Sequence, residues 1–472
     1  MPTRFDLLIK DVQAVDSLNK FNVQSDIGIK GSKITAVAQG LNKEEASTVI
    51  EGNFLTAIPG LIDTHVHLGI SSCGFNMLTR AGITTALDMS GTSQDIAKTA
   101  LKFGTGITYG TLEAIIPGTN IANNDPSTEE IRQFVENALS NGSYGVKILG
   151  GHFPLTPAAS KRMVRFCQDN GIYIAWHAGS TENGSDMKGM REAVTAAAGA
   201  FLHLPHINAY CRGSFASPPS ETMEALELLQ ENPAIISESY LSPRNGANLI
   251  CDENGIPKSK IVLNCLRKNN FSEDREGVRA AIRKGFLAVM KDINHETCLI
   301  EGQEGVEFFD EQDSKVSGSF DNINPLSSRL LAAAGRRYPA NEFTVDALAT
   351  DGGCIPRNVT LKTGIEFVRM GVFTMQEFVH KACLMPARML NLENKGHLSI
   401  GADADITIFN PQTGKAEFVI VQGRTLLSRG ILHSGTPTAF CTDKGLSFYE
   451  RKNLPVFSVT PNLTRLNRSL NP

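Results

Sequence analysis

Two histidines separated by a single residue form the clearest chemical motif in this chain. They are His65 and His67 in the run DTHVHL, directly after the apolar run AIPGLI. On a β-strand, residues i and i+2 point to the same side, so both imidazoles can reach one metal ion. The alternative is a pair of packed or surface histidines, but the apolar run before them favours a metal site.

Four further residues of ligand type stand at the ends of later apolar runs. Lys147 lies in GVKILG, His177 in IAWHAG and His206 in LPHINA, and Asp351 ends the last run. The first three are 30 and 29 residues apart (147 to 177, 177 to 206), which is about one strand–helix unit. They therefore occupy equivalent strand ends, and imidazole and carboxylate groups are ligands that suit zinc.

Lys147 is unusual because it lies within an apolar strand, where an unpaired ammonium is costly to bury. One explanation is an ion pair with an acidic neighbour. A second is reaction with carbon dioxide, which turns the amine into an anionic oxygen ligand that can bridge two cations. The histidines and the aspartate at matching strand ends favour the second explanation.

Eight apolar runs in the middle of the chain alternate with helical segments. This order predicts an α/β fold with a parallel (β/α)8 barrel of the TIM type. Active sites of such barrels form at the carboxyl ends of the strands, where the ligand candidates lie. The runs cover 61–68, 82–89, 106–116, 144–150, 171–178, 201–207, 234–241 and 342–351.

Alternating, strand-like patterns flank the barrel at both chain ends. We expect 1–57 and 396–435 to form one small β-sandwich domain beside a barrel over 58–395. The stretch 242–341 breaks the strand–helix rhythm and is interpreted as an insertion over the barrel mouth, with a helix over 277–291. The polar, proline-containing segment 436–472 is expected to be an extension on the surface or against an oligomer partner.

Composition excludes several classes of protein. The 472 residues carry 45 Lys and Arg against 49 Asp and Glu, a net charge of -4, which argues against a mainly electrostatic binder of nucleic acid or membrane surfaces. No apolar run of about 18 residues is present, and the first residues lack the apolar core of a signal peptide. The nine cysteines are odd in number and form no CxxC pair, which indicates reduced thiols in a cytoplasmic protein.

The ligand candidates and two flanking segments together resemble the amidohydrolase superfamily. The segments are FLTAIPGLIDTHVHL (54–68) and GHLSIGADADITIFN (396–410). The pattern is similar to the binuclear-metal branch that holds hydantoinases, dihydroorotases, isoaspartyl dipeptidases and N-acyl-D-amino-acid deacylases. The resemblance covers residues 5 to about 430 and is far more specific for the superfamily than for a substrate.

This resemblance implies a metal-dependent hydrolase that cleaves an amide-type C–N bond in a small molecule. The substrate would be a cyclic amide or ureide, or an N-acyl amino-acid-like compound, and the enzyme a homo-oligomer (dimer or tetramer). The implied metal ligands are His65, His67, Lys147, His177, His206 and Asp351. Two zinc ions would share N6-carboxylated Lys147 as a bridge. His65 and His67 would hold one ion, and His177 and His206 the other. A metal-bound hydroxide would attack the carbonyl, with Asp351 as general base and then general acid.

Departures from the family pattern narrow the substrate. Gly69 stands where dihydroorotases typically carry an arginine, and Ala209 where deaminases usually carry a glutamate. His152 takes the place of the tyrosine that stabilises the oxyanion in hydantoinases, and it is a candidate catalytic and substrate-binding residue. Met89 lies where zinc D-aminoacylases have a bridging cysteine, yet the insertion is reminiscent of those deacylases.

Further candidate substrate contacts are Arg212, Tyr240 and Arg357, with Glu113 considered beside them. Each arginine lies six residues after a strand-end ligand and is suited to grip a carboxylate. A one-metal deaminase or imidazolone-type hydrolase with an unmodified Lys147 is the alternative enzyme. A non-catalytic relative is disfavoured because such relatives lose ligands and this chain keeps all six.

Overall fold

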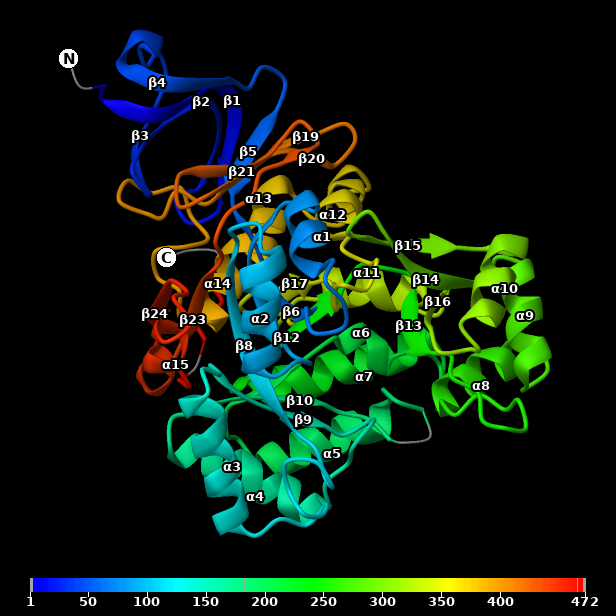
Figure 1. Ribbon diagram of the computed structural model, residues 1–472. Helices are drawn as coiled ribbons and strands as arrows, with labels where there is room; N and C mark the ends of the chain where they lie inside the picture. Colours follow the sequence, from blue (N-terminus) through cyan, green and yellow to red (C-terminus); the bar gives the residue numbers. More distant parts are fainter. Residues whose placement is uncertain (1–2, 181–182, 465, 470–472) are drawn as a thin grey trace.

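The centre of the computed structural model, which describes residues 3–180, 183–464 and 466–469, is a parallel barrel (Figure 1). The strand order is β17-β12-β11-β10-β9-β8-β7-β6-β18, and the ring closes where Gly352 and Gly353 of β18 pair with Val66 and His67 of β6. The strands are β6 (Leu61–His67), β7 (Ile83–Asp88), β8 (Thr108–Ile115), β9 (Gly145–Leu149), β10 (Tyr173–His177), β11 (Leu202–Leu204), β12 (Ile235–Tyr240), β17 (Ala347–Ala349) and β18 (Gly352–Gly353). All eight predicted runs contain a barrel strand.

Helices connect these strands and cover the outside of the barrel. In α3, the buried residues Ile131, Phe134, Val135 and Ala138 recur at helical spacing and face the core. Ser127 caps this helix by accepting the Glu130 N–H at 3.2 Å, and the Glu130 side chain accepts the Ser127 N–H in return, which completes a capping box. The helices are α1 (Gly74–Arg80), α2 (Ser93–Phe103), α3 (Thr128–Ser140), α4 (Pro157–Asp169), α5 (Met187–Ala197), α6 (Ile207–Tyr210), α7 (Pro218–Glu231), α11 (Leu326–Ala334), α12 (Thr360–Arg369), α13 (Met375–Val379), the π-helical turn η2 (His380–Leu384) and α14 (Met385–Met389).

Both chain ends contribute to a second sheet, which confirms the predicted fold class. Hydrogen bonds join its nine strands in one continuous sheet, with the order β22-β21-β20-β19-β5-β1-β2-β3 and β4 beside β1. Residues from both ends, among them Ile9, Ile27, Ile408 and Ile420, share one hydrophobic core. The elements are β1 (Phe5–Asp16), β2 (Phe21–Lys30), β3 (Lys33–Ala38), the short turn η1 (Lys43–Glu45), β4 (Ala46–Glu51), β5 (Thr56–Pro59), β19 (Ile406–Asn410), β20 (Lys415–Val421), β21 (Arg424–Ser428) and β22 (Ile431–Leu432).

The stretch between β12 and β17 contains a small antiparallel sheet of four strands with its own hydrophobic core. The expected helix over 277–291 is wrong in its second half. Gly285 has a left-handed φ of 71° and ends α9, and the residues after it form β14, because a short apolar run fits a strand as well as a helix. The elements are β13 (Asn245–Asn248), α8 (Lys260–Lys268), α9 (Arg275–Arg283), β14 (Leu287–Ile293), β15 (Glu296–Ile300), α10 (Gly302–Glu311) and β16 (Ser317–Phe320).

The final segment packs against the barrel and adds two strands to its sheet. Strand β23 (Thr438–Cys441) is fully buried and pairs with the first residues of β8, and β24 (Val456–Ser458) pairs with β23. Between them lie the turn η3 (Asp443–Gly445) and α15 (Leu446–Glu450). Arg468 is buried in an ion pair with Asp346, so the tail is packed against the barrel.

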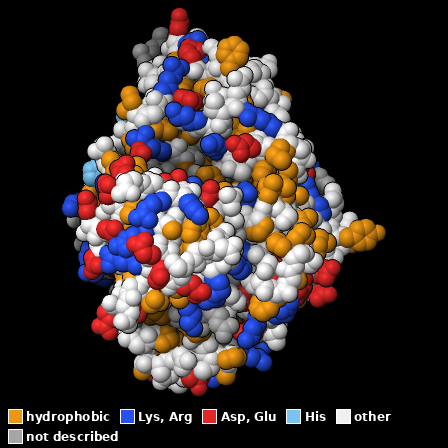
Figure 2. Space-filling view, turned by 90° about the vertical axis from the view of Figure 1, so that its right-hand side faces the viewer, with side chains coloured by type: hydrophobic (Ala, Val, Ile, Leu, Met, Phe, Trp, Pro, Cys, Tyr) orange, Lys and Arg blue, Asp and Glu red, His pale blue; other side chains and the backbone are white. Residues whose placement is uncertain are grey.

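Acidic and basic side chains are interspersed on the face shown in Figure 2, beside a group of hydrophobic side chains. Within the described part of the chain, every helix is too short or too polar to cross a membrane.

Candidate metal centre

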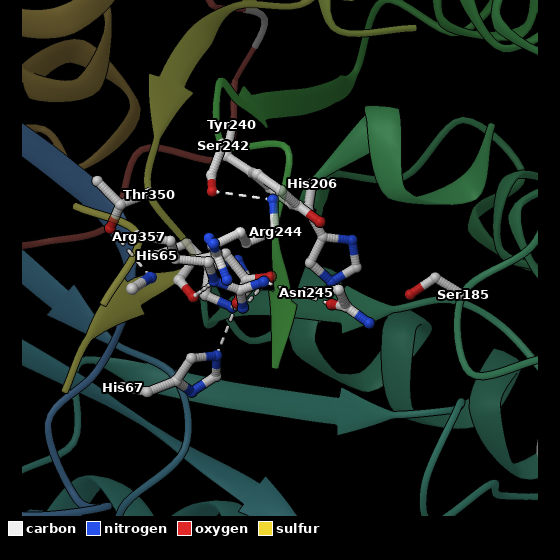
Figure 3. Close-up of polar contacts among 12 residues, drawn as sticks. His65, His67, Ser185, His206, Tyr240, Ser242, Arg244, Asn245, Thr350 and Arg357 are labelled. Atoms are coloured by element: carbon white, nitrogen blue, oxygen red, sulfur yellow. Dashed lines mark hydrogen bonds and ion pairs between the residues drawn. The ribbon is translucent and has the colours of Figure 1, made fainter. Parts of the chain in front are cut away.

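The end of β6 and the loop between β17 and β18 bring three ligand candidates together. Nε2 of His67 lies 2.7 Å from Oδ1 of Asp351, and Nε2 of His65 lies 3.4 Å from the same oxygen. The potential ligand atoms of these three residues all lie within 4.8 Å of one another. Figure 3 shows His65 and His67 approaching the same centre from their strand.

A second pair of histidines meets beside the first. Nδ1 of His177, at the end of β10, lies 2.9 Å from Nε2 of His206. His206 adopts a left-handed backbone conformation, with φ of 43°, in the turn between β11 and α6. Two imidazole nitrogens on one tetrahedral zinc are separated by roughly 3.3 Å, from Zn–N bonds of about 2.0–2.1 Å. The observed geometry is therefore close to that of a shared ligand pair.

Lys147 lies between these pairs on β9 and is only 1% exposed. Its Nζ lies 3.3 Å from Nε2 of His65, and burial lowers the pKa of this amine to about 8. No ion pair among the described residues includes Lys147. The simpler explanation of this lysine, an ion pair with an acidic neighbour, is therefore not supported by the described residues.

These residues fit a pair of divalent cations. His65 and His67 converge on Asp351, two further imidazole nitrogens face each other, and a buried amine lies 3.3 Å from His65. Burial would raise the pKa of the Asp351 carboxyl, but the Arg357 guanidinium and His65 outweigh it and hold this pKa well below its ordinary value. Asp351 is therefore an anion, as a ligand or a proton acceptor must be.

A cavity of about 280 Å³ opens onto these groups. Its polar wall includes His67, Lys147, His177 and Asp351, and its apolar wall includes Ile70, Phe153, Ile261 and Ile355. Its size suits a small molecule. His152 is exposed at this cavity, with its ring centroid 5.1 Å from that of His177.

The two candidate arginines both line the cavity but differ in their partners. Nη2 of Arg357 lies 2.7 Å from Oδ2 of Asp351, and its guanidinium lies over the Tyr240 ring, 5.1 Å from the centroid. Arg212 donates to Oη of Tyr240 and Oδ1 of Asn324, each at 2.8 Å. In the part of the chain that is described, no carboxylate forms an ion pair with Arg212.

Glu113, considered above as a substrate contact, lies outside the cavity beside the ligand candidates. It lines a separate cavity of about 410 Å³ with Thr92, Asn120 and Asn137, between α2 and α3. Its position on β8 directs it to the helix layer of the barrel, away from the ligand cluster.

Sequence reasoning missed several residues that contact the cluster. Glu238 on β12 accepts hydrogen bonds from His65 and His206, and Ser185 lies 3.2 Å from Nε2 of His177. The one available signal for Glu238 was a carboxylate inside the apolar run AIISESYL. His203 is fully buried and hydrogen-bonded to Glu238. Asn324 comes from the insertion, where no motif marks it.

Comparison with known proteins decides the family. The Amidohydrolase family profile matches residues 56–426. The chain belongs to the amidohydrolase family. The predicted family and the predicted class of enzyme, a metal-dependent hydrolase of amide-type C–N bonds, are both confirmed.

Two curated relatives of this amidohydrolase are dihydroorotases. That of Geotalea daltonii is 21% identical over 445 residues, covering 88% of this chain and 91% of the relative. That of Elusimicrobium minutum is 24% identical over 435 residues, covering 85% and 87%.

Solved structures show the same fold at lower identity. The N-acyl-D-glutamate deacylase of Bordetella bronchiseptica, complexed with zinc and a phosphonate inhibitor, has a TM-score of 0.66 at 13% identity, over 92% of this chain and 98% of that one. A D-aminoacylase has a TM-score of 0.65 at 14% identity, over 92% and 99%. The dihydropyrimidinase of Brevibacillus agri has a TM-score of 0.58 at 16% identity, over 92% and 97%.

Proposed function

We propose that this amidohydrolase cleaves its C–N bond at a two-metal centre bridged by N6-carboxylated Lys147, in a small substrate that carries a carboxylate. The observation that carries the proposal is the buried Lys147 amine, which lies 3.3 Å from Nε2 of His65 and lines the same cavity as His67 and His177, without a carboxylate partner among the described residues. His65 and His67 would hold one cation with Asp351, and His177 and His206 the other.

Carboxylation explains how a lysine can be stable at this place. The unprotonated amine nitrogen attacks the carbon of CO2, an N–C bond forms, and the nitrogen loses a proton to leave a carbamate anion. The product carries two oxygens and a negative charge, so it balances cations where an ammonium would repel them.

Two divalent cations, assigned as zinc because the donors are imidazoles and carboxylate oxygens, would polarise the scissile carbonyl and lower the pKa of water. Asp351 accepts the proton of the attacking water and delivers it to the leaving nitrogen as the C–N bond breaks. The products are a carboxylate and an amine. His152 faces the same cavity and is placed to donate a hydrogen bond to the developing oxyanion.

The two arginines receive different roles. Arg212 is assigned to the substrate carboxylate, because it lines the cavity and no described carboxylate neutralises it. Arg357 is assigned to Asp351, whose carboxylate it contacts at 2.7 Å. This arrangement supports a substrate with an anionic group on the side of Arg212.

Dihydroorotase activity is disfavoured despite the names of the relatives. Gly69 stands where dihydroorotases typically carry an arginine that holds the substrate carboxylate. A Cβ atom at this position would lie 3.1 Å from the backbone Cα of Gly91, so a larger side chain would force the neighbouring loop to move. The carboxylate must therefore bind elsewhere, and Arg212 is the available cation.

The proposal also covers the cellular compartment and the oligomeric state of the protein. All nine cysteines are free thiols and seven are buried, which supports a reducing compartment such as the cytoplasm. A homo-oligomer, dimer or tetramer, is proposed from the family resemblance.

The test is a pH-stat assay of the zinc-loaded protein on two groups of compounds. One group holds hydantoin- and dihydropyrimidine-type rings, and the other holds N-acyl amino acids of both hands. Hydrolysis in either group, with two zinc ions per chain, is the expected result. Release of ammonia from an aminated ring by a protein with one zinc would instead support the deaminase alternative.

A further inference from the structure

The buried carboxylate of Glu238 contacts one histidine from each proposed metal position. We propose that Glu238 is a positioning residue on which both metal positions depend, an inference that rests on the two-metal function proposed above. Glu238 lies on β12 and has no exposed surface. It does not line the cavity among the described residues, so it acts through the histidines and not on the substrate.

Three hydrogen bonds fix this carboxylate. Oε1 accepts from Nδ1 of His65 at 3.1 Å and from the backbone N–H of His206 at 2.8 Å. Oε2 forms a hydrogen bond with Nε2 of His203. The Tyr173 hydroxyl lies 2.9 Å from Nδ1 of His203, so the network continues to β10.

The contact with His65 determines which nitrogen can bind metal. A carboxylate only accepts hydrogen bonds, so the proton of the neutral His65 ring must sit on Nδ1. Nε2 then carries the free lone pair, and it is the nitrogen that faces Lys147 and Asp351. A carboxylate on the outer nitrogen of a metal-binding histidine also increases the basicity of the ligand.

The contact with His206 acts on the backbone. His206 has a φ of 43°, a left-handed conformation that is unfavourable for a residue with a side chain. The hydrogen bond from its N–H to Glu238 stabilises this turn, and the turn directs the ring toward His177. The Glu238 carboxylate therefore orients the side chain of His65, in one proposed metal position, and the main chain of His206, in the other.

The experiment compares zinc retention in Glu238→Gln and Ser185→Ala. The zinc-loaded proteins are dialysed against graded concentrations of a chelator, and zinc per chain is counted by elemental mass spectrometry. Glutamine keeps the size of Glu238 but replaces one acceptor oxygen with an NH₂ group, so we expect E238Q to lose both ions at about 10- to 100-fold lower chelator concentration. Among the described side chains, the Ser185 hydroxyl forms a hydrogen bond with His177 and with no other proposed ligand, so S185A should lose one ion and keep the other.

Asp346→Asn is the control for a general loss of stability. Asp346 is a buried carboxylate that pairs with Arg468 and accepts the N–H of Ser237. It contacts no proposed ligand, so D346N should melt at lower temperature with wild-type zinc retention. Zinc retention in E238Q equal to that of the wild type, or loss of one ion only, overturns the inference.

A second measurement needs no variant and applies if E238Q does not fold. Nitrogen-15 NMR of histidine-labelled, zinc-loaded wild-type protein should show the His65 proton on Nδ1. A proton on Nε2 would overturn the inference. A wild-type chain that binds no zinc would overturn the proposed function as well, whereas two retained ions in both wild type and E238Q would refute only the role of Glu238.

Discussion

Arg212 presents a positive charge to the cavity, and its hydrogen bonds go to neutral groups. Tyr240 and Asn324 fix its guanidinium from the barrel and from the insertion. Charge-assisted, bidentate pairing with a carboxylate is the interaction that arginine forms best. We therefore assign substrate binding, and not the chemical step, to Arg212.

Replacing Arg212 with methionine should weaken binding more than catalysis. We expect KM to rise about 10- to 100-fold with little change in kcat, because a hydrogen-bonded charged pair contributes roughly 1.5–3 kcal/mol. Steady-state kinetics on a carboxylate substrate and on its neutral amide analogue measure the effect. An equal loss for both compounds would contradict the assignment.

His152 is the cavity residue assigned to the oxyanion. His152→Ala should lower kcat by about 100- to 1,000-fold, the typical cost of losing one such donor. Zinc content should stay at the wild-type value, because His152 is not among the proposed ligands. Loss of zinc in H152A would show that the residue supports the metal centre instead.

At the scale of elements, the sequence predicts the position of a candidate ligand where a ligand-type residue stands at the end of a strand. The His65–His67 pair, the positions of Lys147 and His177, and the eight strands all follow from local patterns. Glu238 could not be recognised, because its role depends on contacts with residues on other strands. The expected helix over 277–291 failed because one glycine decides where a helix ends and a strand begins.

The C-terminal tail is an element that the family match does not include. It lies beyond residue 426, the end of the match, yet Arg468 is buried against Asp346 and donates to the carbonyl of Ile235 at 2.8 Å. Removing one partner of a buried ion pair typically costs about 3–5 kcal/mol. R468M should therefore lower the free energy of unfolding in a urea titration by about that amount, and R451M, an exposed position in the same tail, should change it little.

The buried carboxyl of Glu113, on β8, should make the stability of the protein depend on pH. Burial raises the pKa of this carboxyl from 4.5 to about 7, so between these values the folded state keeps a proton that the unfolded state has lost. Stability from this group therefore falls as the pH rises through this window. E113Q removes the titration, so its melting temperature should exceed that of the wild type more at pH 8 than at pH 5. An equal difference at both pH values would contradict the assignment.

At the scale of the whole molecule, the site is assembled from two regions. The barrel supplies the proposed ligands, and the insertion supplies Asn245 and Gly246 to the cavity wall and Asn324 to Arg212. Figure 1 shows the insertion beside the barrel, as a separate lobe. Because the insertion forms part of the cavity wall and supplies none of the proposed ligands, changes in the insertion can alter the substrate without altering the chemistry.

Carbon-13 NMR can detect the proposed carbamate on Lys147 itself. The protein is reconstituted with zinc and ¹³C-labelled bicarbonate, beside the variant Lys147→Ala. We expect a carbamate resonance in the wild type and none in K147A, which should also lose zinc and activity together. An active, two-zinc wild type without a carbamate resonance, or a fully active K147A, would contradict it.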